Sequence, residues 1–206
     1  MIARRCFRAK RQLLSQHPLV CVPPSWLRGF ASEASGSPLL GQRAWVHPTA
    51  VLIGRVKLGD EVSVWPMVTI RGDVNTIEVG ARSNVQDGAV IHATGCYSHA
   101  PPGGYPTKVG EDVTIGHKAL LHGCTISDRV LIGMGAIIMD GVSIEPDVIV
   151  AAGSLVPPGK VLTSGLWKGN PARFARELTG EELQFLPQSA KNYMELKDRY
   201  LRGDFQ

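Results

Sequence analysis

Aliphatic residues recur at every sixth position along much of this chain. Residues 109–162 divide without a gap into nine six-residue blocks, with one column at Leu120, Ile126, Ile132, Ile138, Ile144, Val150 and Val156. A second column lies two positions earlier, at Val130, Ala136, Val142 and Val148, and residues 52–74 keep the same period. A period of six fits neither an amphipathic helix nor an alternating strand. It is typical of a parallel β-solenoid whose short strands stack block upon block.

The pattern therefore predicts an all-β solenoid of hexapeptide repeats over residues 37–165. Three blocks make one coil of 18 residues, and stacked coils place their aliphatic side chains in one continuous core. The alternative is a set of ordinary strands joined by glycine turns.

Residues 166–206 predict a helical segment that packs along the outside of the solenoid. Thr179 and Glu182 have the spacing of a capping box. Pro187 suits the first position of a new helix, on which Ala190, Tyr193, Leu196 and Tyr200 follow helical spacing. We therefore expect a short helix followed by a longer one.

Composition narrows the class of protein. Charged residues make up 19% and hydrophobic residues 44% of the 206 positions, which excludes general disorder. No run approaches the roughly 18 to 20 apolar residues of a membrane helix, so we expect no transmembrane span. The four cysteines lie far apart without a CxxC pair, which argues against a disulfide framework and a zinc finger.

The net charge of +4 comes from the N-terminus. Residues 1–36 hold six of the 22 basic groups and one of the 18 acidic groups, so the remainder has 16 basic and 17 acidic groups. Nothing in this near-neutral body indicates nucleic-acid binding.

Residues 1–36 have the composition of a mitochondrial transit peptide, since arginines alternate with apolar residues and acids are almost absent. The stretch from Arg28 to Ser32 resembles a processing site with cleavage after Phe30. The alternative is a basic surface helix that stays on the protein.

Four histidines cluster in the sequence, at His92, His99, His117 and His122. His92 and His122 are 30 residues apart, and the 12 residues beyond one coil are about the length of a Gly- and Pro-rich interruption after Ala93. If those residues loop out, the two histidines stack on one face with adjacent strands about 4.8 Å apart and can share a metal ion.

His117 precedes His122 by five residues and lies elsewhere around the coil, so we expect it to reach such an ion only from a neighbouring chain. Three histidines with an open fourth position suit catalytic zinc. The alternative is that these outward histidines are simply solvated.

Four segments, beginning at Arg71, Asn84, Thr114 and Leu121 (RGDVN, NVQD, TIGH and LHGC), resemble the γ-class carbonic anhydrase family. With Gly169-Asn-Pro-Ala172, the resemblance covers about residues 40–200. It implies a left-handed parallel β-helix with a C-terminal α-helix, in a homo- or heterotrimer with zinc at the subunit interface. The implied zinc ligands are His92 and His122 of one chain and His117 of the next.

The resemblance also implies roles for other polar residues. Gln86 would hydrogen-bond the zinc-bound water, with Asn84 beside it. Arg71 and Asp73 would pair at the subunit interface, where Arg71 could also attract bicarbonate, and Asp87 would join that network. Tyr193 would lie near the site, although plain helix packing explains it equally well.

The implied reaction is the reversible hydration of CO₂ to bicarbonate, for which zinc lowers the pKa of bound water from 15.7 to about 7. Residues 92–110 lack the acidic proton shuttles that active family members carry, and Val74 stands where a glutamate can occur. His99 is the titratable group in this loop whose ordinary pKa, about 6.5, would suit the task.

With the transit-like leader, the chain resembles the carbonic-anhydrase subunits on the matrix side of the membrane arm of mitochondrial respiratory complex I. Three functions stay open from the sequence. The first is a zinc carbonic anhydrase, the second a catalytically weak or inactive structural subunit of complex I, and the third a hexapeptide-repeat acyltransferase.

Overall fold

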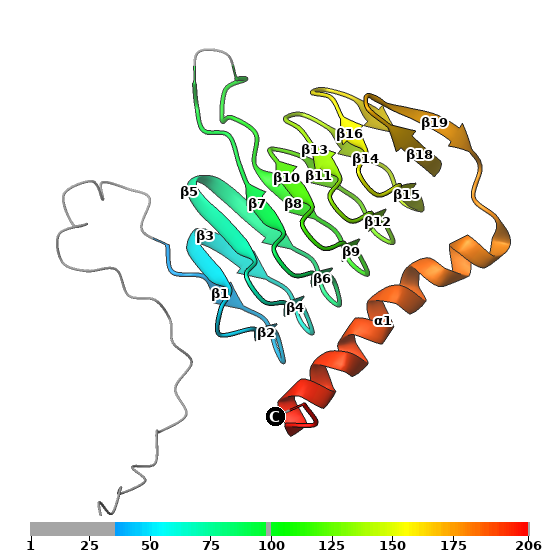
Figure 1. Cartoon of the computed structure of the whole chain (residues 1–206). Coiled ribbons are helices and arrows are strands. Elements are labelled where there is room, and N and C mark those ends of the chain that lie inside the picture. The colour runs from blue at the N-terminus through cyan, green and yellow to red at the C-terminus, as the bar shows by residue number, and fades with distance from the viewer. Residues whose placement is uncertain (1–35, 98–99, 206) are drawn as a thin grey trace, which may run out of the picture.

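The computed structural model describes residues 36–97 and 100–205. It is a left-handed parallel β-helix with three flat faces, flanked by one long C-terminal helix (Figure 1), so the predicted fold class is confirmed. The expected transit segment, apart from Gly36, and His99 lie outside the described residues.

The first face stacks six parallel strands: β3 (Val51–Leu58), β5 (Thr69–Val79), β7 (Val90–His92), β10 (Leu120–His122), β13 (Ile137–Ile138) and β16 (Leu155–Val156). The second face shares β3 and β5, which bend around the corner, and adds β1 (Leu39–Leu40), β8 (Thr107–Val109), β11 (Thr125–Ile126), β14 (Ser143–Ile144) and β17 (Val161–Leu162).

The third face is a separate sheet, formed by β2 (Trp45–Val46), β4 (Ser63–Val64), β6 (Asn84–Val85), β9 (Thr114–Ile115), β12 (Leu131–Ile132), β15 (Val148–Val150), β18 (Gly165–Gly169) and β19 (Ala172–Arg176). All pairs in it are parallel except the β18–β19 hairpin, which the sequence analysis did not anticipate.

The core is the expected aliphatic column with one shift of register. Ile126, Ile132, Ile138 and Ile144 are buried. Leu120, counted into this column from the sequence, is instead 37% exposed, and Leu121 is buried in its place. The reason is that Leu121 pairs with Ile138 while Thr125 pairs with Ser143, so the coil of His122 is one residue shorter at its corner.

The earlier stretch also departs from a strict period. Val74 is half-buried rather than part of the core, because β5 carries extra residues between Gly72 and Ile77 where it turns the corner. Ile77 occupies the core position instead.

One corner of the solenoid is built from charged residues in the left-handed backbone region. Arg43, Glu61, Arg82, Asp112, Arg129 and Asp147 have φ between 53° and 61°. Arginine and carboxylate alternate from coil to coil and pair at 2.5 Å (Arg43–Glu61), 2.7 Å (Arg82–Asp112) and 2.8 Å (Arg129–Asp147). These ion pairs offset part of the strain that a side chain meets at positive φ.

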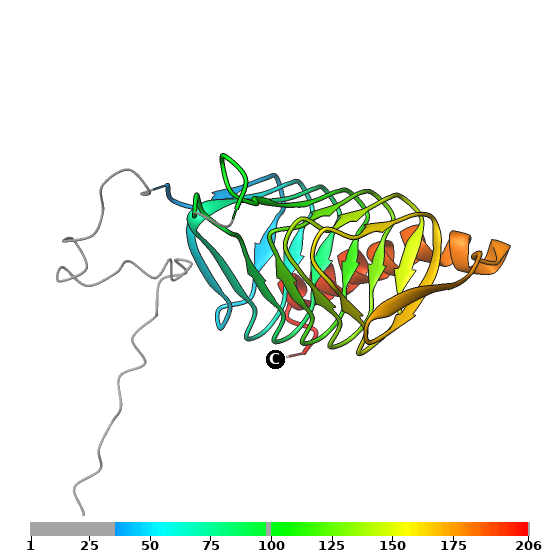
Figure 2. The same ribbon diagram turned by 90° about the horizontal axis from the view of Figure 1, so that it is seen from above.

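A single helix, α1 (Gly180–Arg202), follows the β18–β19 hairpin and runs back along the third face (Figure 2), where it contacts β4, β6 and β9. The capping box of Thr179 and Glu182 is confirmed. The expectation of two helices divided at Pro187 is wrong, because Pro187 lies inside α1. It is exposed, while Leu186, Ser189 and Ala190 are buried, so packing of that face offsets the lost backbone hydrogen bond.

Within the described part of the chain, no helix is both long and apolar enough to cross a membrane.

Candidate metal centre

His92 and His122 end neighbouring strands in the same register. β7 pairs with β10 so that Val90, Ile91 and His92 face Leu120, Leu121 and His122. The one-coil offset that was counted from the sequence is therefore confirmed. His92 Nδ1 lies 3.0 Å from His122 Nε2.

A carboxylate contacts the far nitrogen of each ring. Asp73 Oδ1 lies 2.9 Å from His92 Nε2, and Asp140 Oδ1 lies 2.6 Å from His122 Nδ1. Thr94 Oγ1 donates to Asp140 Oδ2 at 2.8 Å. These five residues, His92, His122, Asp73, Asp140 and Thr94, form what we call the paired-histidine cluster.

The carboxylates determine what the inner nitrogens can do. A carboxylate only accepts hydrogen bonds, so the ring nitrogen that faces it carries the proton. If both rings are neutral, two lone pairs face each other, and either a metal ion or a proton between the two inner nitrogens removes that repulsion. Two imidazole nitrogens on one tetrahedral zinc, each about 2.0–2.1 Å from the metal, are about 3.3 Å apart. The 3.0 Å separation is close to that value, and it is also the length of an N–H···N hydrogen bond between the rings.

Other nearby groups do not add a third ligand within one chain. Cys124 points into the core, and burial raises the pKa of its thiol to about 12. Within residues 36–97 and 100–205, no three histidine, cysteine or carboxylate side chains converge as a metal site. A third ligand from a neighbouring chain stays a prediction.

Arg71 and Asp73 are paired inside the chain, where the guanidinium donates to the carboxylate. Burial alone would raise the pKa of Asp73, but hydrogen bonds from His92 and Arg71 outweigh burial and lower it. Asp73 thus orients His92 as well as binding Arg71. The interface role expected for Arg71 and Asp73 stays a prediction.

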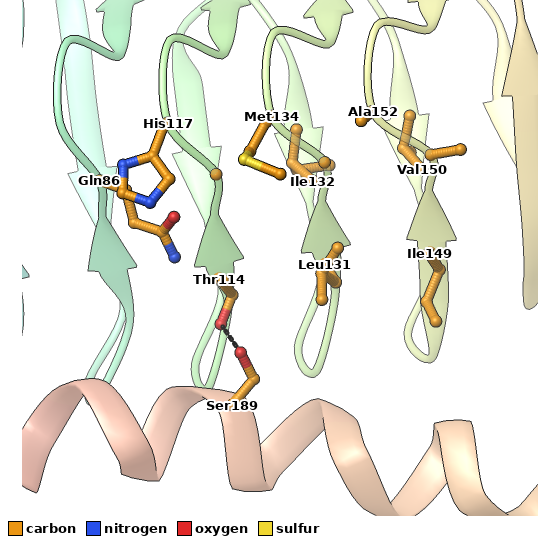
Figure 3. Close-up of a pocket in the computed structure, with 13 residues that line it drawn as sticks. Gln86, Thr114, His117, Leu131, Ile132, Met134, Ile149, Val150, Ala152 and Ser189 are labelled. Carbon is orange, nitrogen blue, oxygen red and sulfur yellow. Dashed lines mark hydrogen bonds between the residues drawn. The ribbon is translucent and has the colours of Figure 1, made fainter.

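His117 belongs to a second group at another corner, which we call the glutamine cluster: Gln86, Asn84, Thr114, His117, Asp87 and Ser189. His117 Nδ1 lies 3.0 Å from Asp87 Oδ2, and the side chain is 42% exposed. Its ring is next to Gln86 in Figure 3. The third histidine is therefore accessible to another molecule.

A buried chain of polar side chains orients Gln86. Gln86 Nε2 donates to Asn84 Oδ1 at 3.1 Å, Asn84 Nδ2 donates to Thr114 Oγ1 at 3.0 Å, and Thr114 Oγ1 lies 3.0 Å from Ser189 Oγ on α1. All four residues are buried. Because the NH₂ group of Gln86 donates to the buried Asn84, its carbonyl oxygen stays available to accept a hydrogen bond from a ligand.

An apolar groove of about 410 Å³ opens beside this cluster. Figure 3 shows it between the third face and α1, with Gln86 and His117 at one end and Met134, Leu131 and Ile149 along its length. Such walls suit a small uncharged molecule better than an anion.

Tyr193 lies on the same side of the solenoid, half-buried on α1 and edge-on to Trp65. Burial raises the pKa of its hydroxyl, and the negative charge of Asp87 raises it further. The structure therefore brings Tyr193 toward the glutamine cluster, as the resemblance implies, although its catalytic role stays a prediction.

Residues 123–158 match the family described as bacterial transferase hexapeptide (six repeats). Escherichia coli Protein YrdA is 51% identical over 165 residues, which cover 80% of this chain and 89% of YrdA. A hexapeptide transferase family protein from Anaplasma phagocytophilum has a solved structure that is 40% identical, with a TM-score of 0.73, over 79% of this chain and 92% of that one.

The Arabidopsis thaliana protein named gamma carbonic anhydrase 1, mitochondrial, is 47% identical over 161 residues. The match covers 78% of this chain and 58% of the plant protein, so it spans little more than half of that protein's length. The chain belongs to the hexapeptide-repeat family that includes YrdA and the Anaplasma phagocytophilum protein, and it is a homologue of the plant γ-carbonic anhydrases.

Proposed function

We propose that this chain is a γ-carbonic-anhydrase-like subunit of a homo- or heterotrimer that holds zinc between two chains. The observation that carries the proposal is the 3.0 Å contact between His92 Nδ1 and His122 Nε2, with a carboxylate behind each ring. His117 of a neighbouring copy would be the third ligand. Its exposure at a different corner, away from the paired-histidine cluster, supports that arrangement.

The proposed reaction is the reversible hydration of CO₂ to bicarbonate. Zinc, when bound, lowers the pKa of a water molecule to about 7, which provides the nucleophile. Gln86 would accept a hydrogen bond from that nucleophile through the carbonyl oxygen that its buried partners leave free. The apolar groove would admit CO₂, and the cation of Arg71 would favour the bicarbonate product.

The chain offers few groups that could carry away the proton released by the reaction. Residues 92–110 contain no carboxylate, and position 74 is a half-buried valine. This observation favours the second candidate function, in which the subunit has an intact zinc site but little turnover and acts mainly as a structural part of an assembly.

We propose the matrix side of the mitochondrial inner membrane as the location and the membrane arm of respiratory complex I as the assembly. The basic, acid-poor leader and the similarity to a plant protein named as mitochondrial support the location. Mass spectrometry of the natively purified protein tests both points, because it gives the mature N-terminus, the partner chains and the bound metal. Recovery without complex I subunits would contradict the assembly.

The shared zinc site is tested by mixing two defective proteins. One carries His117→Ala and the other carries His92→Ala with His122→Ala, and each alone should bind no zinc. Co-refolded, they should regain roughly one site in three within each mixed trimer, because one of the three interfaces again has all three histidines. His47→Ala is the matched control and should keep full zinc content.

Two outcomes would overturn this reading. Full zinc content in the His117→Ala protein would contradict a site between chains. A wild-type protein that binds acyl-coenzyme A and no zinc would instead support the acyltransferase alternative. CO₂ hydration by the zinc-loaded trimer then separates an enzyme from a structural subunit.

A further inference from the structure

A one-residue difference between two coils brings Asp140 beside His122. Leu121 pairs with Ile138, and Thr125 pairs with Ser143. Between these pairs, the coil of His122 has three residues, 122–124, and the next coil, which we call the upper one, has four, 139–142. The extra residue in the upper coil lets its corner project over the histidine. Asp140 is the carboxylate at that corner.

The space for this carboxylate is provided by Gly123. Gly123 has φ +56°, and a Cβ atom at this position would collide with Asp140 Oδ1. Its conformation is one that glycine adopts without strain. The missing side chain thus lets the carboxylate approach His122 Nδ1 to 2.6 Å.

A second side chain fixes the carboxylate itself. Thr94 is 4% exposed, and its hydroxyl donates to Asp140 Oδ2 at 2.8 Å. The same hydroxyl oxygen is 3.4 Å from His122 Nδ1. With one oxygen bonded to Thr94 and the other to His122, the carboxylate has little freedom to turn away.

We propose that Asp140, held by Thr94, is the positioning residue that keeps the proton of His122 on Nδ1 and so leaves Nε2 free as a metal ligand. This proposal rests on the proposed zinc site for its consequence, but the pairing itself exists without metal. Carboxylates behind metal-binding histidines typically change metal affinity by 10–100-fold. Neither the hexad period nor the spacing of the histidines points to Asp140.

The first test is zinc affinity, measured on the full chain by competition with a chromogenic chelator. Asp140→Ala should weaken zinc binding 10–100-fold. Asp140→Asn keeps an acceptor oxygen and should recover part of that loss. Asp147→Ala is the matched control, because it removes a corner carboxylate that binds Arg129, and it should leave zinc affinity unchanged. Wild-type affinity in Asp140→Ala would overturn the proposal.

The second test needs no metal. Long-range proton–nitrogen correlation spectra of the metal-free chain report which nitrogen of His122 carries the proton. Wild type should show Nδ1–H, and Asp140→Ala should shift the ring toward Nε2–H. An unchanged tautomer would overturn the positioning role whether or not zinc binds. A wild-type protein with the Nδ1–H tautomer but no zinc binding would contradict the proposed function alone.

Thr94→Val covers the case in which Asp140→Ala does not fold. It should move the tautomer in the same direction and weaken zinc binding by a smaller factor, while Thr94→Ser should retain both properties. Wild-type spectra and affinity for Thr94→Val would contradict the role assigned to the threonine.

Discussion

The paired-histidine cluster and the glutamine cluster are held in place by different parts of the fold. In the first, the two rings are aligned by the ladder between β7 and β10, and their carboxylates come from strands and corners of the solenoid. In the second, the buried Gln86 and Asn84 depend on a hydrogen-bond chain that ends on α1. The solenoid alone therefore builds the paired-histidine cluster, whereas the glutamine cluster also needs the helix.

Under the proposed function, this difference separates metal binding from the orientation of a bound ligand. Changes that loosen α1 should disturb the glutamine cluster and leave His92 and His122 aligned. Changes within the coils that carry β7 and β10 should disturb the alignment of His92 and His122 and leave the glutamine cluster in place.

The largest effect is expected from Glu61→Gln. The side chain of Lys197 is fully buried and its ammonium donates to Glu61 and, at 3.0 Å, to the carbonyl of Arg43, which ties α1 to the first coils. The substitution leaves this cation without its main partner. Breaking such a pair typically costs 3–5 kcal/mol, and we expect about 3 kcal/mol because the Arg43 carbonyl and the Asp198 carboxylate, 3.8 Å from the ammonium, remain. Urea unfolding measures the loss, and hydrogen exchange should rise in α1 but not in β7 and β10.

The same residue predicts a pH dependence. Burial alone would raise the pKa of Glu61, but hydrogen bonds from Lys197 and Arg43 outweigh it, so the pKa is lower than the ordinary 4.5. Its stabilisation is therefore complete above pH 4.5 and is lost as the pH falls through the lower, folded-state pKa. In Glu61→Gln, the free energy of unfolding should therefore depend less on pH below 4.5. Glu195→Gln, whose ion pair with Lys191 spans 4.0 Å on the exposed side of α1, should not.

Asn84→Ala should have an intermediate effect. It removes the acceptor for Gln86 Nε2 and the donor to Thr114, both in buried surroundings. We expect the free energy of unfolding to fall by about 1–3 kcal/mol. Because Gln86 is then free to turn, CO₂ hydration should fall while zinc stoichiometry stays constant. Asn192→Ala is the matched control, since it removes an Asn–Gln hydrogen bond on the exposed side of α1 and should change neither property. Loss of zinc from Asn84→Ala would contradict the separation.

The alignment of His92 with His122 could be predicted from the sequence because it is a matter of counting. A coil has a fixed length, and the interruption after Ala93 is visible, so the offset of His92 from His122 follows. The fold was predictable for the same reason, since the hexad period is local. Asp140 was not, because its approach depends on one coil being a residue shorter than the next. That difference also moved the core position from Leu120 to Leu121.

The glutamine cluster could be predicted only in part. Gln86 and Asn84 came from a resemblance of short segments and His117 from its spacing in the histidine group, whereas Ser189 carries no signal in the sequence. Its role depends on where α1 lies against the third face, and that placement is set by packing between segments distant in the chain. Pro187 shows the same limit. The local preference of proline for the first position of a helix predicted a break there, whereas α1 continues through it because its buried face packs on the solenoid.

The smallest effect is expected from Ser189→Ala. Ser189 is 6% exposed and its hydroxyl is 3.0 Å from Thr114 Oγ1, so its loss should cost about 0.5–1.5 kcal/mol. Without this partner, the Thr114 hydroxyl can donate to Asn84 instead, which lets Asn84 and then Gln86 reverse their amides. Two sets of Gln86 side-chain amide signals should then appear in nitrogen-correlated spectra. Ser154→Ala removes a comparable buried bond, the 3.1 Å contact from Gly169 N, and should leave a single set. A single, unshifted set in Ser189→Ala would show that the strands orient Gln86 without the helix, and the contrast between the two clusters would fail.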